Sequence, residues 1–289
     1  MPRMRQGGTG GTRGYVFDRT RADEERRLEK QSAIMDPFTE RLFRDGGLGE
    51  GMRVLDLGSG AGDVAMLAAR IVGTAGVVVG VEGSPVAIET ARRRAAAAGL
   101  RHVTFLERDL RDLGGVLAPG TRPFDAVVGR FVLQFMPDPS AVLRAAVAAV
   151  RPGGLVRFQE CDDHYTYAYP ATPLWNQIRT WLLAALDHAG VESRMGLRLY
   201  RTFRQAGLPD PDLRLEAAIG GGADAPVFVW ADVLRSVIPT LEEAGIATEA
   251  GIDPDTLEDR LRAELTATGG VMISIVVVGA WSRTAPASR

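Results

Sequence analysis

A short apolar strand that leads directly into a glycine-rich turn and then into a helix is the most constraining feature of this sequence. The strand covers residues 53–57, the turn over 58–62 reads GSGAG, and an apolar helix follows over 65–71. Glycines at such a turn let a ligand approach the backbone closely, and the helix N-terminus offers unpaired N–H groups. The motif predicts the first unit of a parallel α/β sheet, with a ligand site where its first strand ends.

Strands and helices alternate along most of the chain after this motif. Further strands are expected at 77–81, 103–106, 124–129, 155–159, 213–219 and 271–281, and helices at 85–98, 141–150 and 198–206. These strands are short and largely apolar, which is typical of a parallel sheet covered by helices on both faces. The sequence therefore predicts an α/β fold.

Two stretches interrupt the alternation and are expected to form a cap over the substrate. They lie near 161–195 and 222–269, and they contain helical patterns at 173–189, 226–244 and 255–266. Ahead of the sheet, residues 1–14 are rich in glycine and arginine, which indicates a flexible tail. Helices at 19–30 and 38–43, within 15–51, are expected to cover the ligand site. Residues 52–289 then form the main domain with its cap insertions.

Charge and cysteine content argue against several classes of protein. The chain has 34 basic and 36 acidic residues, so no net field attracts nucleic acid or an anionic membrane. Its longest apolar run, 271–280, is too short to span a bilayer. Cys161 is the single cysteine, which excludes an intrachain disulfide and fits a cytoplasmic protein. Exposed apolar helices of the cap would make a homodimer unsurprising.

Acidic residues around the turn favour one kind of ligand over another. Asp56 lies in the first strand just before the glycines, and Glu82 ends the second strand, where an acid can bind both hydroxyls of a ribose. A dinucleotide would place its pyrophosphate at the turn and normally requires a third glycine where Asp63 stands. S-adenosylmethionine has no phosphate and carries two positive groups, so nearby carboxylates favour it. Asp56 and Glu82 still have simpler interpretations, as a residue that holds the turn and as a surface acid.

Several segments in the expected order resemble the motifs of class I S-adenosylmethionine-dependent methyltransferases. Residues 54–62 resemble motif I, 82–85 the acidic tip of strand two, 107–110 the adenine contact, 124–130 motif IV, and 150–154 the turn before strand five. The resemblance covers about 52–159 and is strongest to the small-molecule branch that resembles ubiquinone and menaquinone biosynthesis enzymes. It implies a Rossmann-like sheet of seven strands, mostly parallel, with an antiparallel last strand at 271–281.

The resemblance also implies which residues hold S-adenosylmethionine. They are Asp56, Gly58, Ser59, Gly60, Glu82, Gly83, Asp109, Leu110, Arg130, Gln134, Tyr15 and Gln31. Tyr15 and Gln31 are included because such families often fold an N-terminal segment over the amino-acid end of the donor. Asp109 has the alternative role of a helix N-cap, and Arg130 has the alternative of a purely structural role.

The segment after strand five is the expected acceptor site, because it lies beside the donor at the carboxyl end of the sheet. His164 is the candidate base or acceptor anchor, although a hydrogen-bonded loop histidine is the simpler interpretation. Glu160 could accept a proton or orient an acceptor amine, and Tyr165 completes the catalytic candidates. An aromatic box is a further hypothesis, with packing of the cap as its alternative. Its members would be Tyr165, Tyr167, Tyr169, Trp175, Trp181 and Trp230.

These observations predict a methyltransferase that acts on a small aromatic or apolar metabolite at O, N or C, with an indole ring carbon as one concrete candidate. Methyl transfer from a sulfonium needs alignment more than acid–base chemistry. No histidine or cysteine cluster has metal-ligand spacing, so no metal is expected. The alternatives are a nicotinamide-dependent oxidoreductase, a nucleic-acid or protein methyltransferase, and a binding module. Against the first, the only lysine, Lys30, precedes the sheet, so a Tyr/Lys catalytic pair is missing.

Overall fold

A twisted seven-stranded sheet forms the centre of the molecule. The structure is a computed structural model that describes the backbone of residues 21–113 and 122–286, and side chains from Lys30 onward within those ranges. The strand order is β3 (Val103–Glu107), β2 (Val77–Glu82), β1 (Arg53–Leu57), β4 (Phe124–Arg130), β5 (Val150–Cys161), β10 (Val277–Arg283) and β7 (Asp212–Glu216). The first five run parallel, and β10 is antiparallel to both its neighbours. The predicted fold class is confirmed.

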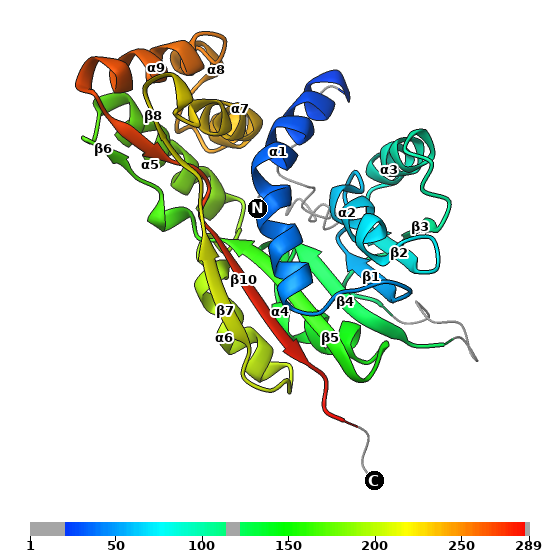
Figure 1. The fold of residues 1–289 in the computed structure, drawn as a ribbon. Coiled ribbons are helices and arrows are strands. Elements are labelled where there is room, and N and C mark those ends of the chain that lie inside the picture. The colour runs from blue at the N-terminus through cyan, green and yellow to red at the C-terminus, as the bar shows by residue number, and fades with distance from the viewer. Residues whose placement is uncertain (1–20, 114–121, 287–289) are drawn as a thin grey trace, which may run out of the picture.

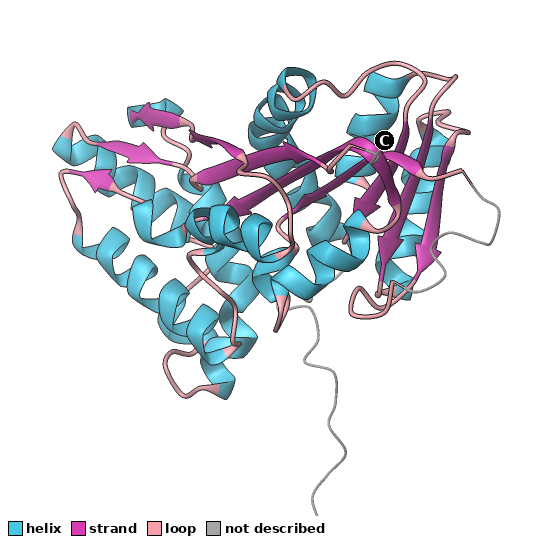
Figure 2. Ribbon diagram, turned by 90° about the horizontal axis from the view of Figure 1, so that it is seen from below, coloured by secondary structure: helices cyan, strands magenta, loops and turns pink. Residues whose placement is uncertain are grey.

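Helices cover both faces of this sheet (Figure 2). One face packs on α4 (Pro139–Val147) and α6 (Met195–Gln205), and the other on α2 (Asp63–Val72), α3 (Pro85–Ala97) and the end of α1 (Arg21–Asp45). Successive strand residues alternate between the faces: Val127 joins the first core and Val128 the second. Because both faces are buried, the strands are continuously apolar, which is the pattern that the sequence shows.

The cap is a separate layer with its own hydrophobic core. It consists of α5 (Pro173–His188), α7 (Val227–Glu243), α8 (Glu249–Ile252), α9 (Leu257–Thr268) and a small sheet in the order β6 (Ala168–Tyr169), β9 (Val271–Ile273), β8 (Ile219–Gly221). In Figure 1, α1 lies between this cap and the helices α2 and α3, and it contacts both α2 and α7. Helix α1 therefore connects the cap to the helices that cover the sheet.

Several predicted elements differ from the structure in their boundaries. The helices expected at 19–30 and 38–43 are one helix, α1, which contains Pro37 at an exposed position. The strand expected at 271–281 is split into β9 and β10, and the one at 213–219 is split into β7 and β8. At the breaks Ser274 N donates to Ala218 O and Ser274 Oγ accepts from Ala218 N, so a side chain replaces a ladder bond.

Strand β5 is longer than predicted, because it begins at Val150. It includes Gly153 and Gly154, and its pairing with β4 is irregular near them.

Short 3-10 helices follow three strands: η1 (Leu133–Phe135), η2 (Asp163–Tyr165) and η3 (Gly222–Asp224). None of the helices in the described part of the chain combines the length and the apolar composition that crossing a bilayer requires.

Candidate functional site

The glycine turn has the backbone that its sequence predicts. Gly58 and Gly60 have φ angles of 63° and 48°, in the left-handed region that side chains rarely adopt. A Cβ on Gly58 would lie 2.5 Å from Val132 Cγ2, so this glycine lets β1 pack against the loop after β4. A Cβ on Gly60 would meet nothing within 4 Å. The turn is therefore closed on the Gly58 side and open at Gly60, where a ligand can approach the backbone.

Unpartnered acceptors surround the turn at the end of β1. Asp56 is fully buried, and neither carboxylate oxygen has a hydrogen bond of good geometry among the described residues, although the Ala65 N–H is near enough to favour the charged form slightly. Ser59 is 5% exposed, and its hydroxyl is also without a partner there. Burial raises the pKa of Asp56 well above its usual value, and the charge of Arg130 opposes this rise. Buried polar groups are normally hydrogen-bonded, so this arrangement indicates a site for a ligand that brings donors or positive charge.

Glu82 connects the tip of β2 to the glycine turn. Its Oε2 accepts from Gly60 N at 3.1 Å, and its Oε1 accepts from Ser84 N at 2.8 Å. Ser84 caps α3, since its hydroxyl accepts from Ala87 N. Each carboxylate oxygen has a second lone pair, so Glu82 can accept further hydrogen bonds from ligand hydroxyls. Gly83 follows it, with open space around the site of its missing side chain apart from Arg108 O at 3.7 Å.

Asp63 does not contribute the negative charge that the sequence predicted for the turn. Arg94 Nη2 lies 2.6 Å from Asp63 Oδ1, and Ser32 Oγ donates to the same oxygen at 3.1 Å. Asp63 is therefore neutralised within the protein and helps to join α1 and α3 to the start of α2. The electrostatic preference of the turn rests on Asp56 and Glu82 alone.

Arg130 and Gln134 lie at the end of β4, as predicted, but they face the site differently. Arg130 Nη1 donates to Asp36 Oδ1 at 3.1 Å and to Thr39 Oγ1 at 2.9 Å, so this guanidinium joins α1 to the sheet. This is the structural role that the sequence left open. Gln134 is 7% exposed, and its side-chain oxygen has no partner among the described residues. Gln31 is half-buried on α1, and Tyr15 lies outside the described residues.

Asp109 and Leu110 follow the tip of β3. Asp109 is half-exposed, and both its oxygens accept from the Arg111 guanidinium, while Oδ1 also accepts from Arg111 N. The hydrogen bonds from Arg111 lower the pKa of Asp109 to about 2. An adenine amine would share this carboxylate with Arg111, so the adenine contact stays a prediction. Leu110 is buried, with its Cδ1 3.5 Å from the position of a Cβ on Gly58, and forms one wall of the turn.

Glu160 is fully buried at the end of β5 and holds the loop after β4. Its carboxylate accepts from the backbone N–H groups of Val132, Leu133 and Gln134 at 3.0, 2.8 and 3.4 Å. Burial raises the pKa of Glu160 to about 7, although the three N–H groups act in the opposite direction. Because both oxygens point at backbone, the geometry favours a positioning role over direct contact with an acceptor.

The loop that Glu160 holds begins with a strained residue. Phe131 has a φ of 56°, a conformation that costs a residue with a Cβ about 1 kcal/mol or more. Its N–H donates to Gln159 O at 2.9 Å, so the strained backbone is pinned to β5. Positive φ angles at such residues often occur at functional sites. Phe131 is not among the site residues predicted from the sequence, although its place directly after a strand tip was a usable signal.

His164 and Tyr165 lie in η2, on the outer side of the strand end. His164 Nε2 is 3.1 Å from Ser193 Oγ, and Arg194 Nη2 is 3.1 Å from Nδ1. Burial, followed by the charge of Arg194, lowers the pKa of His164. Tyr165 is 45% exposed. The catalytic roles of both residues stay predictions.

The predicted aromatic box is not assembled. Tyr165, Tyr167 and Tyr169 are exposed at the surface, whereas Trp175 and Trp230 are buried in the cap core with ring centroids 5.0 Å apart. The alternative interpretation, packing of the cap, is correct for these two tryptophans. They pack because each has a large apolar ring, and Trp230 Nε1 donates to Ile273 O.

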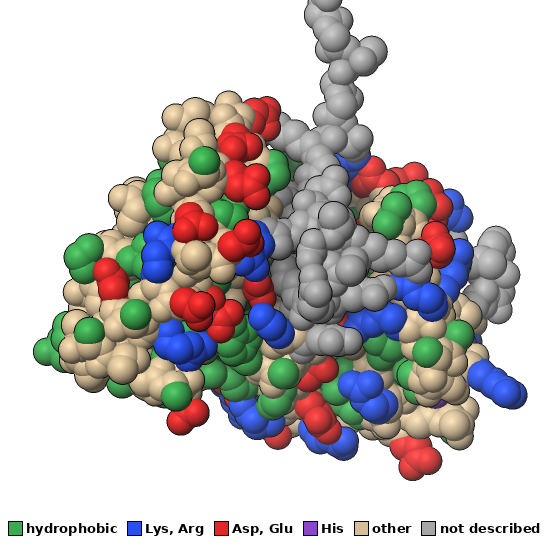
Figure 3. All heavy atoms as spheres, turned by 90° about the horizontal axis from the view of Figure 1, so that it is seen from above, with side chains coloured by type: hydrophobic (Ala, Val, Ile, Leu, Met, Phe, Trp, Pro, Cys, Tyr) green, Lys and Arg blue, Asp and Glu red, His purple; other side chains and the backbone are tan. Residues whose placement is uncertain are grey.

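A different apolar set, from α1, the loop after β4 and α7, packs partly buried against the cap core. Its members are half-buried and contact the cap core from three elements: Ile34, Phe38, Phe131, Phe135 and Phe228. Figure 3 looks onto this end of the molecule, where acidic, basic and apolar side chains are interspersed on the bordering surfaces. Among the side chains that the structure describes, no three His, Cys, Asp or Glu residues gather as a metal site would require.

Comparison with known proteins points to one family. A family model described as a methyltransferase domain matches residues 48–207, which is more than half of the chain. The matched segment contains the glycine turn, Glu82, Glu160 and the loop after β4. It ends before the second half of the cap.

Individual relatives match over shorter stretches. An arsenite methyltransferase of Aquipseudomonas alcaligenes is 34% identical over 116 residues, which are 38% of this chain and 33% of that protein. An aklanonic acid methyltransferase of Streptomyces is 36% identical over 110 residues, 37% of this chain and 47% of that protein. The chain thus spans about half or less of these curated relatives. A phosphoethanolamine N-methyltransferase of Haemonchus contortus has a similar fold, with a TM-score of 0.56 and 17% identity over 96% of this chain and 61% of that one.

Proposed function

Because this chain belongs to the methyltransferase domain family, within the class I S-adenosylmethionine-dependent enzymes, we propose that it transfers a methyl group from S-adenosylmethionine to a small, largely apolar acceptor. The observation that carries the proposal is the open glycine turn at Gly60 beside the buried, unpartnered carboxylate of Asp56. A nicotinamide cofactor is not favoured, since a pyrophosphate at the turn would lie beside that carboxylate.

The residues at the turn fit S-adenosylmethionine by their chemistry. Asp56, Ser59 and Gln134 offer unpartnered acceptors to the positively charged amino-acid end, and Glu82 offers lone pairs to the ribose hydroxyls. When bound, the donor supplies a methyl group already activated by the positive charge on its sulfur. The protein then has to align the acceptor and exclude water, which α1 and the cap can do by covering the strand ends.

The acceptor class follows from the half-buried side chains that border this region. Ile34, Phe38, Phe131, Phe135 and Phe228 present apolar surface, four of them as phenyl rings, which suits a flat aromatic or apolar molecule. One relative is named for aklanonic acid and another for arsenite, so relatedness alone selects no acceptor. An O, N or C atom could receive the methyl group. An indole ring carbon remains a concrete candidate, since it needs stacking and little base strength.

The direct test uses donor with a labelled methyl group and a panel of acceptors. The purified protein is incubated with each of several indoles, phenols, quinols and aliphatic amines, and the products are read by mass. We expect label on an aromatic acceptor and no label on the aliphatic amines. Donor binding by calorimetry without transfer to any acceptor, together with binding of NADH, would contradict the proposal.

The ring of Phe131 should contribute to acceptor affinity, and its backbone should set the geometry of the loop after β4. Phe131→Ala keeps the positive φ and loses the ring, whereas Phe131→Gly loses the ring and relieves the strain. We expect the glycine variant to be about 1 kcal/mol more stable than the alanine variant, because glycine adopts this φ freely. Both variants should raise the KM for the acceptor about tenfold and leave donor affinity unchanged. Equal acceptor KM values in wild type and both variants would show that the ring does not face the acceptor.

His164 has both ring nitrogens engaged, so we expect His164→Ala to lower kcat less than about fivefold. Arg194 donates to Nδ1, which leaves the Nε2 proton to bond Ser193, and no lone pair remains for an acceptor proton. Removing a general base normally costs 10²–10⁴ in rate, roughly. His102→Ala is the matched control, since the hydrogen bond of its ring among the described residues goes from Nε2 to Ala69 O in α2. A loss of more than about a hundredfold at pH 8, specific to His164→Ala, would restore His164 as the base.

We also keep the cytoplasmic location and the homodimer as proposals from the sequence. Cys161 is a buried free cysteine, which is compatible with a reducing compartment.

A further inference from the structure

One arginine of the sheet is buried and has no described partner for its positive charge. Arg157 lies on β5 and is 1% exposed, yet its Nε and Nη1 have no hydrogen-bond partner among the described residues. No described carboxylate forms an ion pair with it. Burial and the nearby charge of Arg283 lower the pKa of Arg157 to about 10, so the guanidinium stays positive at neutral pH. An unpaired charge in this position is costly unless a ligand pairs with it.

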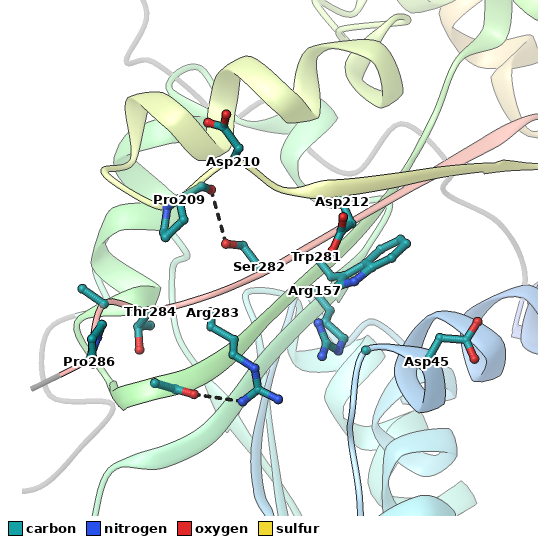
Figure 4. A pocket seen from close by; sticks show the side chains of 13 residues that line it. Asp45, Arg157, Pro209, Asp210, Asp212, Trp281, Ser282, Arg283, Thr284 and Pro286 are labelled. Atoms are coloured by element: carbon teal, nitrogen blue, oxygen red, sulfur yellow. Dashed lines mark hydrogen bonds between the residues drawn. The ribbon is translucent and has the colours of Figure 1, made fainter.

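Arg157 lines a pocket (Figure 4), and its backbone lies two strands across the sheet from Asp56, in register with Val128 between them. The pocket measures about 590 Å³ and is bordered by the turn after α1, by β10 and by the segment before β7. The guanidinium occupies the space beside Gly46, where a Cβ would collide with it. The turn after α1 is thus shaped around the charged end of this side chain.

Arg283 is a second guanidinium on the same pocket. It comes from β10, its Nη1 donates to Gly153 O at 3.1 Å, and its Nη2 lies 3.4 Å from the position of a Cβ on Gly47. It forms no ion pair with a described acid. Two guanidiniums from neighbouring strands therefore border one pocket, close enough for the charge of one to lower the pKa of the other.

The acids of the pocket do not neutralise these two arginines. Asp45 pairs with Arg214 at 2.5 Å, and Asp210 pairs with Arg204. Only Asp212 remains without an ion pair among the described acids of the pocket, and it is exposed to solvent. The unpaired charge that the pocket presents is therefore mainly positive.

We propose that this pocket binds a phosphate group, as inorganic phosphate or as the phosphate of a small monoester. The two positive charges match the charge of a phosphate dianion, and a guanidinium is a favourable donor to phosphate oxygens. A carboxylate has one negative charge and two oxygens, and would leave one arginine unpaired. The pocket is bordered by β5, β10 and the segment before β7, whereas the glycine turn follows β1, and the proposed binding of phosphate does not depend on the proposed activity.

Thermal unfolding of the full chain separates a binding site from a merely structural arginine. In phosphate-free chloride buffer, Arg157→Met should raise Tm by about 2–5 °C, because a methionine of similar length removes an unpaired buried charge. A structural arginine would give the opposite sign. Adding 10 mM inorganic phosphate at constant ionic strength should raise the Tm of the wild type and leave that of Arg157→Met unchanged.

Calorimetry with inorganic phosphate then measures the site directly. Arg283→Met should weaken phosphate binding at least tenfold while the protein stays folded, since Arg283 is exposed. Arg111→Met, which removes an exposed arginine beyond β3, should bind phosphate as the wild type does. Tighter binding of glycerol 3-phosphate than of inorganic phosphate would identify a monoester as the ligand, and equal or weaker binding would identify free phosphate.

Three results would overturn the proposal. They are a fall in Tm for Arg157→Met in chloride buffer, phosphate affinity that is the same in both arginine variants as in the wild type, and acetate binding as tight as phosphate binding at the same ionic strength. Methyl-transfer activity is not used as a readout, so failure here leaves the proposed function untouched, and the reverse also holds.

Discussion

Replacing Glu82 with alanine should lower the affinity for S-adenosylmethionine about a hundredfold while the fold stays intact. Glu82 is the only described side chain that hydrogen-bonds the open glycine, through Gly60 N at 3.1 Å. Its remaining lone pairs are proposed to accept from two ribose hydroxyls. Hydrogen bonds to a charged group contribute about 1.5–3 kcal/mol each, so the loss of two corresponds to roughly two orders of magnitude in Kd or more.

Glu107→Ala is the matched control for this prediction. Glu107 is at the end of the neighbouring strand β3 and pairs in register with Glu82. Its side chain is exposed and has no described hydrogen bond to the glycine turn. Calorimetry should give wild-type donor affinity for Glu107→Ala and the hundredfold loss for Glu82→Ala. Glu82→Gln, which keeps one acceptor oxygen, should fall between them. Normal donor binding by a folded Glu82→Ala protein would show that the ribose is placed wrongly.

Replacing Glu160 with glutamine should lower kcat about a hundredfold and change KM for the donor much less. The carboxylate accepts from three consecutive backbone N–H groups, whereas an amide offers one oxygen and turns its NH₂ toward the remaining donor. The loop that includes Phe131 and Gln134 would then shift. Misplacement of a site by about 1 Å can cost roughly 10²-fold in rate.

The pH dependence distinguishes this positioning role from a merely structural one. The pKa of Glu160 is raised to about 7, so kcat of the wild type should fall below about pH 7 as protonation removes acceptor capacity. Glu160→Gln should lack this acidic limb. A variant with normal kcat, or one that keeps the limb near pH 7, would show that another group controls the loop.

The same ionisation should affect stability with the opposite sign. The pKa of Glu160 in the folded state, about 7, lies above the ordinary value of 4.5, so the folded protein binds more protons than the unfolded chain between these values. The free energy of unfolding therefore falls as pH rises through this window, by up to about 3 kcal/mol for one such group. Asp163, with a pKa also raised to about 7 by burial, contributes in the same direction. Chemical denaturation at pH 5.5 and 8 should show a smaller difference in Glu160→Gln than in the wild type.

Local patterns in the sequence were sufficient for the sheet and the glycine turn. A buried strand, a turn that needs positive φ and an apolar helix each depend on residues close in the chain, and the structure contains all three where they were expected. The same holds for the helical cap segments. The boundaries failed where a distant contact decided them: Ser274 and Ala218 break two strands at once, and nothing local marks either break.

Charges and aromatic rings could not be assigned from their positions in the chain. Asp63 looked like an acid of the turn, but Arg94 from the next helix neutralises it. The aromatic residues after strand five looked like a pocket, but the partly exposed rings near the site come from α1, the loop after β4 and α7. Which residue pairs with which depends on side chains brought together from many residues away, and sequence spacing contains no information on that.

The sequence by itself determined the class of fold, and it predicted the place of the donor site with the two acids, Asp56 and Glu82, beside it. Only the tertiary structure decided that Glu160 holds backbone rather than an acceptor, that Phe131 is strained, and that Arg157 is buried without a partner. The reason is physical: backbone conformation follows largely from neighbours in the chain, whereas burial and pairing of a charge follow from neighbours in space.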